Sequence, residues 1–310
     1  MKISVIGAGN VGATCARVLA LKDSATEIVL LDIVKGLAEG KALDIWQSAP
    51  IDRFNAKTIG VTNDYKATED SSVVVITSGL PRKPGMSRDD LISTNADIVK
   101  KVTENVMKYS PDCILIIVSN PLDVMTYQAY LTSGLPRHKV MGMAGVLDAG
   151  RFRAFLADEL NVSPKDIQAI LMGGHGDTMV PLPRYTMAHG IPIGELVKKE
   201  KLDAIIERTK YGGGELVKLM GTSAWYAPGS AAARMAEAIT RNQRRLLSVC
   251  VKLEGEYGLN DVFVGVPVIL GKRGIERIIE LKLNTEEMKL LHASAKAVKT
   301  TMDVLDKMKK

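Results

Sequence analysis

The first half of the chain contains short, continuous apolar runs that are rich in valine and isoleucine. The clearest runs span residues 3–6, 28–31, 73–76 and 114–118, and weaker candidates span residues 56–61 and 139–142. Apolar runs of this length without polar alternation are typical of parallel strands that are covered on both faces. The pattern therefore predicts a buried parallel sheet.

Helical patterns separate these predicted strands. In residues 95–109, four apolar side chains recur at spacings of one, three and four, which places them on one side of a helix: Ile98, Val99, Val102 and Val106. Strands that alternate with helices are typical of α/β proteins. We therefore predict an α/β fold in which a doubly wound parallel sheet of the Rossmann type occupies residues 1–144.

The pattern changes after residue 145 and becomes mixed. Residues 151–160, 200–208 and 229–251 predict helices, whereas residues 167–172 and 262–270 predict strands, the second with Pro267 at a sheet edge or a bulge. Near the end, apolar residues from Met288 to Leu305 repeat at intervals of three and four, behind a cap formed by Asn284 and Glu287. We predict that residues 145–310 form an α+β domain that carries the substrate site.

A glycine-rich loop follows the first predicted strand and precedes a predicted helix. Residues 7–12 read GAGNVG, in which the glycines allow a tight turn, close approach of a pyrophosphate and close helix packing. Asp32 ends the second apolar run, where its carboxylate can accept ribose hydroxyls and would repel a 2′-phosphate. The pattern predicts NAD as the cofactor, bound by Gly7, Ala8, Gly9, Asn10, Val11, Gly12 and Asp32.

Composition narrows the functional classes. The 310 residues carry a formal net charge of +6, but the basic residues do not cluster with aromatic ones, so no nucleic-acid partner is expected. Cys15, Cys113 and Cys250 are far apart, so no metal or redox site is predicted. No apolar run approaches the ~18 residues that span a membrane, and an apolar strand follows Met1 directly, so a cytoplasmic protein without a membrane partner is expected.

The stretch GGHGD at residues 173–177 contains His175. A histidine suits the removal of an alcohol proton because its unperturbed pKa is about 6.5. We interpret the glycines around it as room for the substrate and the nicotinamide. Such a histidine needs a carboxylate on its other ring nitrogen. Asp148 can supply it, and Arg151, three residues further on a predicted helix, can bind a substrate carboxylate.

Five motifs occur in order along the chain: GAGNVG, LPRKPGMSR, VSNPLDVMT, GVLDAGRFR and GGHGD. Together they resemble the lactate/malate dehydrogenase superfamily, and within it the lactate-dehydrogenase-like, NAD-dependent malate dehydrogenases of bacteria. The resemblance covers essentially the whole chain. It implies reversible oxidation of (S)-malate to oxaloacetate, as in the tricarboxylic acid cycle. His175 is then the proton acceptor, Asp148 orients it, and Arg151 binds the C1 carboxylate.

The resemblance also implies contacts that the patterns alone do not. Asn120 would contact both the substrate and the nicotinamide end of the cofactor. Asn95 and the backbone of Val118, Ser119 and Asn120 would line the cofactor site. Ser223 takes the place where lactate enzymes usually carry a threonine beside the substrate.

The loop LPRKPGMSR is implied to close over the substrate. Arg88 would polarise the reacting carbonyl, and Arg82 would pair with a second carboxylate. The resemblance implies a small-molecule substrate, no metal, and a homo-oligomer in which a tetramer is favoured over a dimer.

Three other functions share some of these features. An L-lactate dehydrogenase has the same fold, and position 82 discriminates because pyruvate lacks the second carboxylate. An NAD-dependent glycosidase of similar fold uses a metal with cysteine and histidine ligands, but no cysteine lies near His175 in the sequence. A non-catalytic NAD sensor needs residues 7–12 and Asp32 but not the three catalytic candidates together.

The interpretation of Asp32 gives a first prediction. The wild-type protein should use NADH far better than NADPH, because the carboxylate and a 2′-phosphate bring like charges together. Asp32→Ser should relax this preference, measured as the ratio of kcat/KM for the two cofactors. A wild type that uses both equally well would contradict the interpretation.

Overall fold

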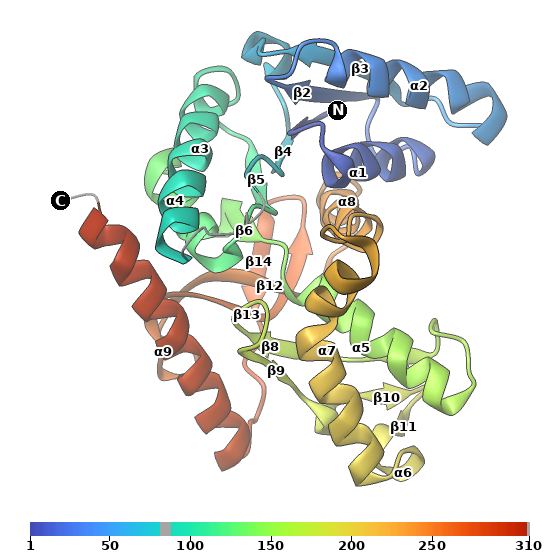
Figure 1. Ribbon diagram of the computed structural model, residues 1–310, viewed down its shortest axis with the longest axis vertical. Coiled ribbons are helices and arrows are strands. Elements are labelled where there is room, and N and C mark those ends of the chain that lie inside the picture. Colours follow the sequence, from blue (N-terminus) through green and yellow to red (C-terminus); the bar gives the residue numbers. More distant parts are fainter. Residues whose placement is uncertain (81–87, 309–310) are drawn as a thin grey trace.

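The six strands predicted in the first half are all present and parallel in the computed structural model, which describes residues 1–80 and 88–308 (Figure 1). They are β1 Lys2–Ile6, β2 Glu27–Asp32, β3 Lys57–Thr62, β4 Val73–Ile76, β5 Ile114–Ile117 and β6 Val140–Gly142. Their order across the sheet is β3-β2-β1-β4-β5-β6. The order changes direction between β1 and β4, as in a doubly wound Rossmann sheet. The predicted α/β fold class is confirmed.

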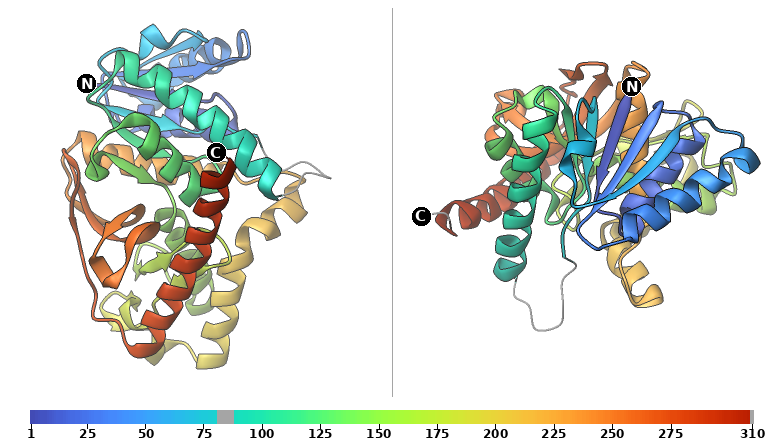
Figure 2. Two further views of the ribbon diagram at one scale, coloured as in Figure 1. Left: turned by 90° about the vertical axis from the view of Figure 1, so that its left-hand side faces the viewer. Right: turned by 90° about the horizontal axis from the view of Figure 1, so that it is seen from above.

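Helices cover both faces of this parallel half. They are α1 Asn10–Leu21, α2 Leu37–Asp52, α3 Arg88–Tyr109 and α4 Leu122–Ser133, with short 3-10 turns at Tyr65–Thr68 and Arg137–Lys139. In Figure 2, α1 and α2 lie on one face of the sheet, and α3 and α4 lie on the other. Every residue of β4 and β5 is buried, which explains why these strands consist of aliphatic residues without alternation.

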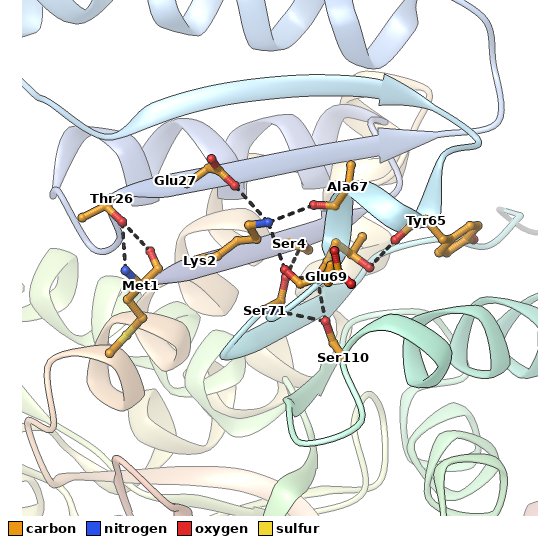
Figure 3. Close-up of polar contacts among 11 residues, drawn as sticks. Met1, Lys2, Ser4, Thr26, Glu27, Tyr65, Ala67, Glu69, Ser71 and Ser110 are labelled. Atoms are coloured by element: carbon orange, nitrogen blue, oxygen red, sulfur yellow. Dashed lines mark hydrogen bonds and ion pairs between the residues drawn. The ribbon is translucent and has the colours of Figure 1, made fainter.

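A small polar network joins the parallel strands near their amino ends (Figure 3). The hydroxyl groups of Ser4, on β1, and Ser71, before β4, lie 2.7 Å apart. Ser110, before β5, accepts a hydrogen bond from the Ser71 amide and donates one to the carbonyl oxygen of Thr68. Buried polar groups require such partners. The network therefore holds the start of β4 in line with β1.

The second half of the chain adds antiparallel strands to the same sheet. They are β8 Leu171–Gly173, β9 Met179–Pro181, β12 Arg245–Glu254, β13 Asn260–Gly271 and β14 Gly274–Ile278. Cys250 of β12 pairs with Gly142 of β6, and the sheet continues through β13 to β8 and β9, with β14 paired to β13. The sheet thus runs on past the boundary predicted at residue 144.

The remaining elements pack around this extended sheet. The helices are α5 Gly145–Leu160, α6 Ile193–Leu196, α7 Lys199–Met220, α8 Tyr226–Thr240 and α9 Thr285–Met308. A small sheet contains β7 Ile167–Gln168, β10 Met187–Ala188 and β11 Ile191–Pro192, and 3-10 turns lie at Pro183–Tyr185 and Glu256–Gly258. None of the described helices is long and apolar enough to cross a membrane.

Helix α8 joins the two halves by packing against α1 (Figure 1). A Cβ atom on Gly229 would lie 2.7 Å from the Cβ atom of Thr14 and 2.9 Å from the carbonyl oxygen of Val11. The two helices therefore approach each other more closely than a side chain at residue 229 would allow.

The helix predicted at residues 229–251 is wrong in its second part. Helix α8 ends at Thr240, and strand β12 begins at Arg245. Asn242 and Arg244 have φ values of 48° and 50°, which an α-helix does not accommodate. The apolar residues that follow form a strand because they pair with β13, which comes later in the sequence.

Pro267 also lies elsewhere than predicted. Strand β13 has partners on both sides, so this proline is not on a sheet edge. One side of β13 pairs with β8 at Gly265 and with β14 from Val268 onward. Pro267 falls between these two partners, where its missing N–H group interrupts neither ladder.

Two smaller differences concern the bounds of other elements. Residues 167–172 split into β7 and β8, and the helix predicted at residues 200–208 extends over the whole of α7.

The C-terminal helix forms as predicted. Leu291, Ala295, Val298, Met302 and Leu305 are buried against the core. The Glu287 amide donates to Asn284 Oδ1, and the Asn284 amide donates back to Glu287 Oε2, which is a capping box with asparagine at the first position. The Glu287 carboxylate also accepts two hydrogen bonds from Arg184. The capping box therefore joins the start of α9 to the segment after β9.

Candidate active site

His175 lies in the loop between β8 and β9, and its imidazole contacts a buried carboxylate. Its Nδ1 atom donates to Oδ2 of Asp148 over 2.9 Å, and the Asp148 side chain is only 2% exposed. Among the residues that the structure describes, the other ring nitrogen, Nε2, has no protein partner. A carboxylate on Nδ1 selects the tautomer in which Nε2 can accept a proton.

Arg151 shares the same carboxylate. It lies three residues after Asp148 in the first turns of α5, and its Nη1 atom is 3.4 Å from Asp148 Oδ1. The buried Asp148 thus faces one permanent cation and one ionisable ring, which offsets the cost of burying its charge. The structure brings together the three residues that the sequence proposed as a unit.

The charges around His175 determine its protonation. Burial by itself lowers the pKa of His175, and the positive charge of Arg151 acts in the same direction. The charge and hydrogen bond of Asp148, together with the charge of Asp123, raise the pKa more strongly, so that it lies above its ordinary value of 6.5. The ring therefore keeps its proton to a higher pH, so a larger fraction of the molecules carry a protonated His175 at a given pH.

Two of the glycines around His175 are required by the packing of the protein itself, which the sequence did not indicate. A Cβ atom on Gly173 would lie 2.7 Å from the Ser294 hydroxyl, and one on Gly174 would lie 2.7 Å from a methyl group of Val298. These two glycines are required because the loop packs against α9. Of the three, only Gly176 has open space around it, and its φ of +102° itself favours glycine.

The glycine-rich loop fits a dinucleotide. Gly7 has a φ of +107°, and a Cβ atom on Gly12 would lie 1.8 Å from the Gly7 carbonyl oxygen, so both glycines are needed by the turn itself. A Cβ atom on Gly9 would meet nothing within 4 Å. The protein's own packing therefore does not require glycine at residue 9, which leaves close approach of a pyrophosphate at the amino end of α1 as its role.

Asp32 lies beside this loop, at the end of β2. Its Oδ2 atom accepts a hydrogen bond from the Ala8 amide at 2.6 Å, and its Oδ1 atom accepts one from the Val34 amide at 2.9 Å. Each carboxylate oxygen has a second lone pair for a ribose hydroxyl. The two bonds hold the carboxylate next to the turn that carries Ala8.

Asn95 joins two segments near the cofactor loop. Its side chain is 1% exposed, accepts a hydrogen bond from the Leu80 amide, and donates to the carbonyl oxygens of Leu80 and Asn120. Val118 and Ser119 bond to the backbone at the end of β4. The Asn95 amide is therefore fully engaged with the protein backbone, whereas the Asn120 side chain is exposed.

Several candidates need separate mention. Arg82 lies outside the described residues, and so does the side chain of Arg88. Ser223 is exposed between α7 and α8. Among the described residues, no group of three or more histidine, cysteine, aspartate or glutamate side chains is arranged to hold a metal ion.

Sequence reasoning missed two features of this site. One is Asp123, which contacts the His175 backbone, although it lies within the motif VSNPLDVMT. The other is the run of three glycines in α7, at residues 212–214, of which two face Arg151. The three glycines interrupt the helical pattern of α7, and this interruption is the sequence signal that could have indicated a close contact there.

Both halves of the chain match models of one family. The model described as the lactate/malate dehydrogenase NAD-binding domain matches residues 1–142, and the model described as the lactate/malate dehydrogenase alpha/beta C-terminal domain matches residues 145–308. The chain belongs to the lactate/malate dehydrogenase family. The predicted family, the NAD cofactor and the dehydrogenase chemistry are thereby confirmed.

Individual relatives resemble the chain over its full length. A malate dehydrogenase of Cytophaga hutchinsonii is 68% identical over 306 residues, which are 99% of this chain and 98% of the relative. A solved malate dehydrogenase structure from Salinibacter ruber has a TM-score of 0.96 at 54% identity and covers 100% of this chain and 99% of its own. A Cryptosporidium parvum lactate dehydrogenase, solved with lactic acid and the cofactor, has a TM-score of 0.94 at 39% identity and covers 98% of each chain.

The glycine run of α7 leads to a prediction about this family member. A Cβ atom on Gly212 would lie 3.3 Å from Arg151 Cδ, whereas one on Gly214 would meet nothing within 4 Å. Gly212→Ala should displace Arg151 and raise KM for the 2-oxo acid roughly 10-fold, which is about 1.4 kcal/mol. Gly214→Ala should leave KM unchanged and stabilise the helix by about 0.5–1 kcal/mol. Steady-state kinetics and thermal unfolding of both variants check this, and equal KM values would contradict it.

Proposed function

We propose that the protein catalyses the reversible oxidation of (S)-malate to oxaloacetate with NAD. The observation that carries this function is the constellation that His175 and Arg151 form around the buried Asp148, because it combines a proton acceptor, its orienting carboxylate and a carboxylate-binding cation. The 68% identity to a malate dehydrogenase over nearly the full chain supports malate as the substrate.

The proton moves between the substrate and His175. In the oxidation, Nε2 accepts the proton of the malate hydroxyl group as the C–H bond of the same carbon breaks. NAD, when bound, supplies the acceptor for the hydride. Asp148 stabilises the imidazolium that forms, and Arg151 holds the C1 carboxylate so that the hydroxyl group faces the ring. In the reduction, the protonated ring returns its proton to the carbonyl oxygen.

The remaining site residues bind the cofactor and the rest of the substrate. The loop of residues 7–12 would hold the pyrophosphate, and the Asp32 carboxylate would accept hydrogen bonds from the ribose hydroxyl groups. The backbone of residues 118–120 lines the nicotinamide end, Asn95 holds this backbone through its hydrogen bond to the Asn120 carbonyl oxygen, and the Asn120 side chain contacts the substrate. On this assignment, residues 1–144 bind the cofactor and residues 145–310 provide the catalytic groups.

The loop arginines select the substrate. We assign Arg88 to polarisation of the reacting carbonyl and Arg82 to the second carboxylate of oxaloacetate. Arginine suits this role because its planar fork binds a carboxylate through two hydrogen bonds and stays charged.

We further propose that the protein is a cytoplasmic homo-oligomer of the tricarboxylic acid cycle, with a tetramer favoured over a dimer. Large apolar side chains are exposed on α2 and α7, where Ile51 is 79% and Leu219 is 76% exposed. Large apolar side chains this exposed would be stabilised by burial between copies of the chain, which supports the proposal of an assembly.

The proton-transfer assignment makes a direct prediction. His175→Asn should lower turnover by roughly 10²-fold or more, because the general acid–base group is lost. NADH binding, measured by calorimetry, should stay nearly intact. Loss of NADH binding together with turnover would instead indicate that His175 maintains the structure of the site.

Substrate selection is tested by the ratio of kcat/KM for oxaloacetate and pyruvate. Pyruvate would leave the charge of Arg82 without a partner, at a cost on the order of several kcal/mol, so we expect a ratio of at least about 10³. Arg82→Gln should shrink this ratio sharply. Lys83→Gln is the matched control, since it removes the adjacent cation. A wild type that prefers pyruvate would contradict the assignment of malate as the substrate. A ratio that falls only in Lys83→Gln would contradict the role of Arg82.

A further inference from the structure

A second buried carboxylate lies on the backbone side of His175. Asp123, in the first turn of α4, is 7% exposed, and its Oδ2 atom accepts a hydrogen bond from the His175 amide at 3.0 Å. Its other oxygen, Oδ1, is buried and makes no hydrogen bond within the described part of the chain. A buried carboxylate with one oxygen left unbonded is costly, and this cost points to a functional reason for an aspartate at this position.

The loop that carries His175 is held from two sides. The Gly174 amide donates to the Ser294 hydroxyl of α9 at 2.8 Å, while the next amide donates to Asp123 of α4. A Cβ atom on Gly174 would lie 3.3 Å from Asp123 Oδ2 and 2.7 Å from a Val298 methyl group. Two successive amides of this loop thus bond to side chains of two different helices, which restricts the direction in which the imidazole projects.

The charged groups around His175 come from two helices. Asp148 and Arg151 approach from α5, and Asp123 approaches from α4. Asp123 in turn faces His175, Asp148 and the thiol of Cys250 on β12. Burial raises the pKa of Asp123 above its ordinary value, and hydrogen bonds from the His175 amide and the Cys250 thiol only partly oppose this rise. When ionised, Asp123 favours the protonated form of the His175 ring.

We propose that Asp123 is a positioning residue for His175, which fixes the backbone from which the imidazole projects and places a second negative charge beside the ring. This inference rests on the proposed function, because it assigns His175 as the group that exchanges the proton. Its two parts are separable by substitution, since an amide oxygen can accept the same hydrogen bond without carrying a charge.

The test uses three variants of the full chain. Asp123→Asn keeps an acceptor for the His175 amide and removes the charge, whereas Asp123→Ala removes both. Asp177→Asn is the matched control, because it removes an exposed carboxylate two residues from His175, where water screens the charge. For each variant, kcat/KM for oxaloacetate is measured from acidic to alkaline pH, with NADH affinity and thermal unfolding measured in parallel.

The expected results follow from the sign of each effect. Reduction of oxaloacetate requires protonated His175, so kcat/KM falls as the pH rises through the pKa of the ring. In Asp123→Asn, this fall should begin at lower pH, by on the order of one pH unit, while the plateau at acidic pH stays within several-fold of wild type. In Asp123→Ala, the plateau itself should fall on the order of 10²-fold because the ring is misplaced. Asp177→Asn should match wild type, and NADH affinity should be unchanged throughout.

Either of two kinetic results would overturn the inference. An unshifted pH profile in Asp123→Asn would show that the charge does not act on His175. A plateau equally low in Asp123→Asn and Asp123→Ala would show that the acceptor does not position the ring.

If Asp123→Ala fails to fold, hydrogen exchange of the His175 amide decides the positioning role. That amide should stay as protected in Asp123→Asn as in wild type, and faster exchange would overturn the role. A wild type inactive with oxaloacetate would instead refute the proposed function, so the two failures are distinguishable.

Discussion

The hydrogen bond between His175 and the buried carboxylate of Asp148 is the interaction on which the site depends. An aspartate that is 2% exposed is stable as an anion only with partners, and here Arg151 and His175 supply them. The same contact selects the histidine tautomer and raises its pKa. The burial of Asp148 on α5 therefore affects the protonation of His175 through this contact.

This contact forms because one sheet passes through both halves of the chain. Strand β6 leads directly into α5, which carries Asp148, and the antiparallel strands β12, β13 and β8 lead to the loop of His175. The cofactor loop lies at the end of β1 in the parallel half, and α8 packs closely on α1 at Gly229. The two halves of the chain are thus joined through the sheet and through this helix pair.

The close fold similarity to both malate and lactate dehydrogenases indicates where specificity must lie. TM-scores of 0.96 and 0.94 separate the two activities very little, so the backbone does not distinguish their substrates. Such a difference in substrate can rest on a few side chains. On the function proposed above, the constellation of His175, Asp148 and Arg151 would serve any 2-hydroxy acid, and Arg82 would discriminate between the substrates.

The sequence by itself determined the features that depend on local pattern. The six parallel strands, the turn at residues 7–12 and the capping box of α9 are local, because continuous apolar runs, glycine spacing and cap residues act over a few positions. The motifs also pointed to His175, Asp148 and Arg151, which the structure brings into contact. Only the tertiary structure decided that residues 245–254 form a strand, because their partner β13 comes later in the chain. It also revealed Asp123 behind His175 and the glycines of α7 beside Arg151. Such contacts join residues tens of positions apart, and no local pattern records which distant surfaces will meet.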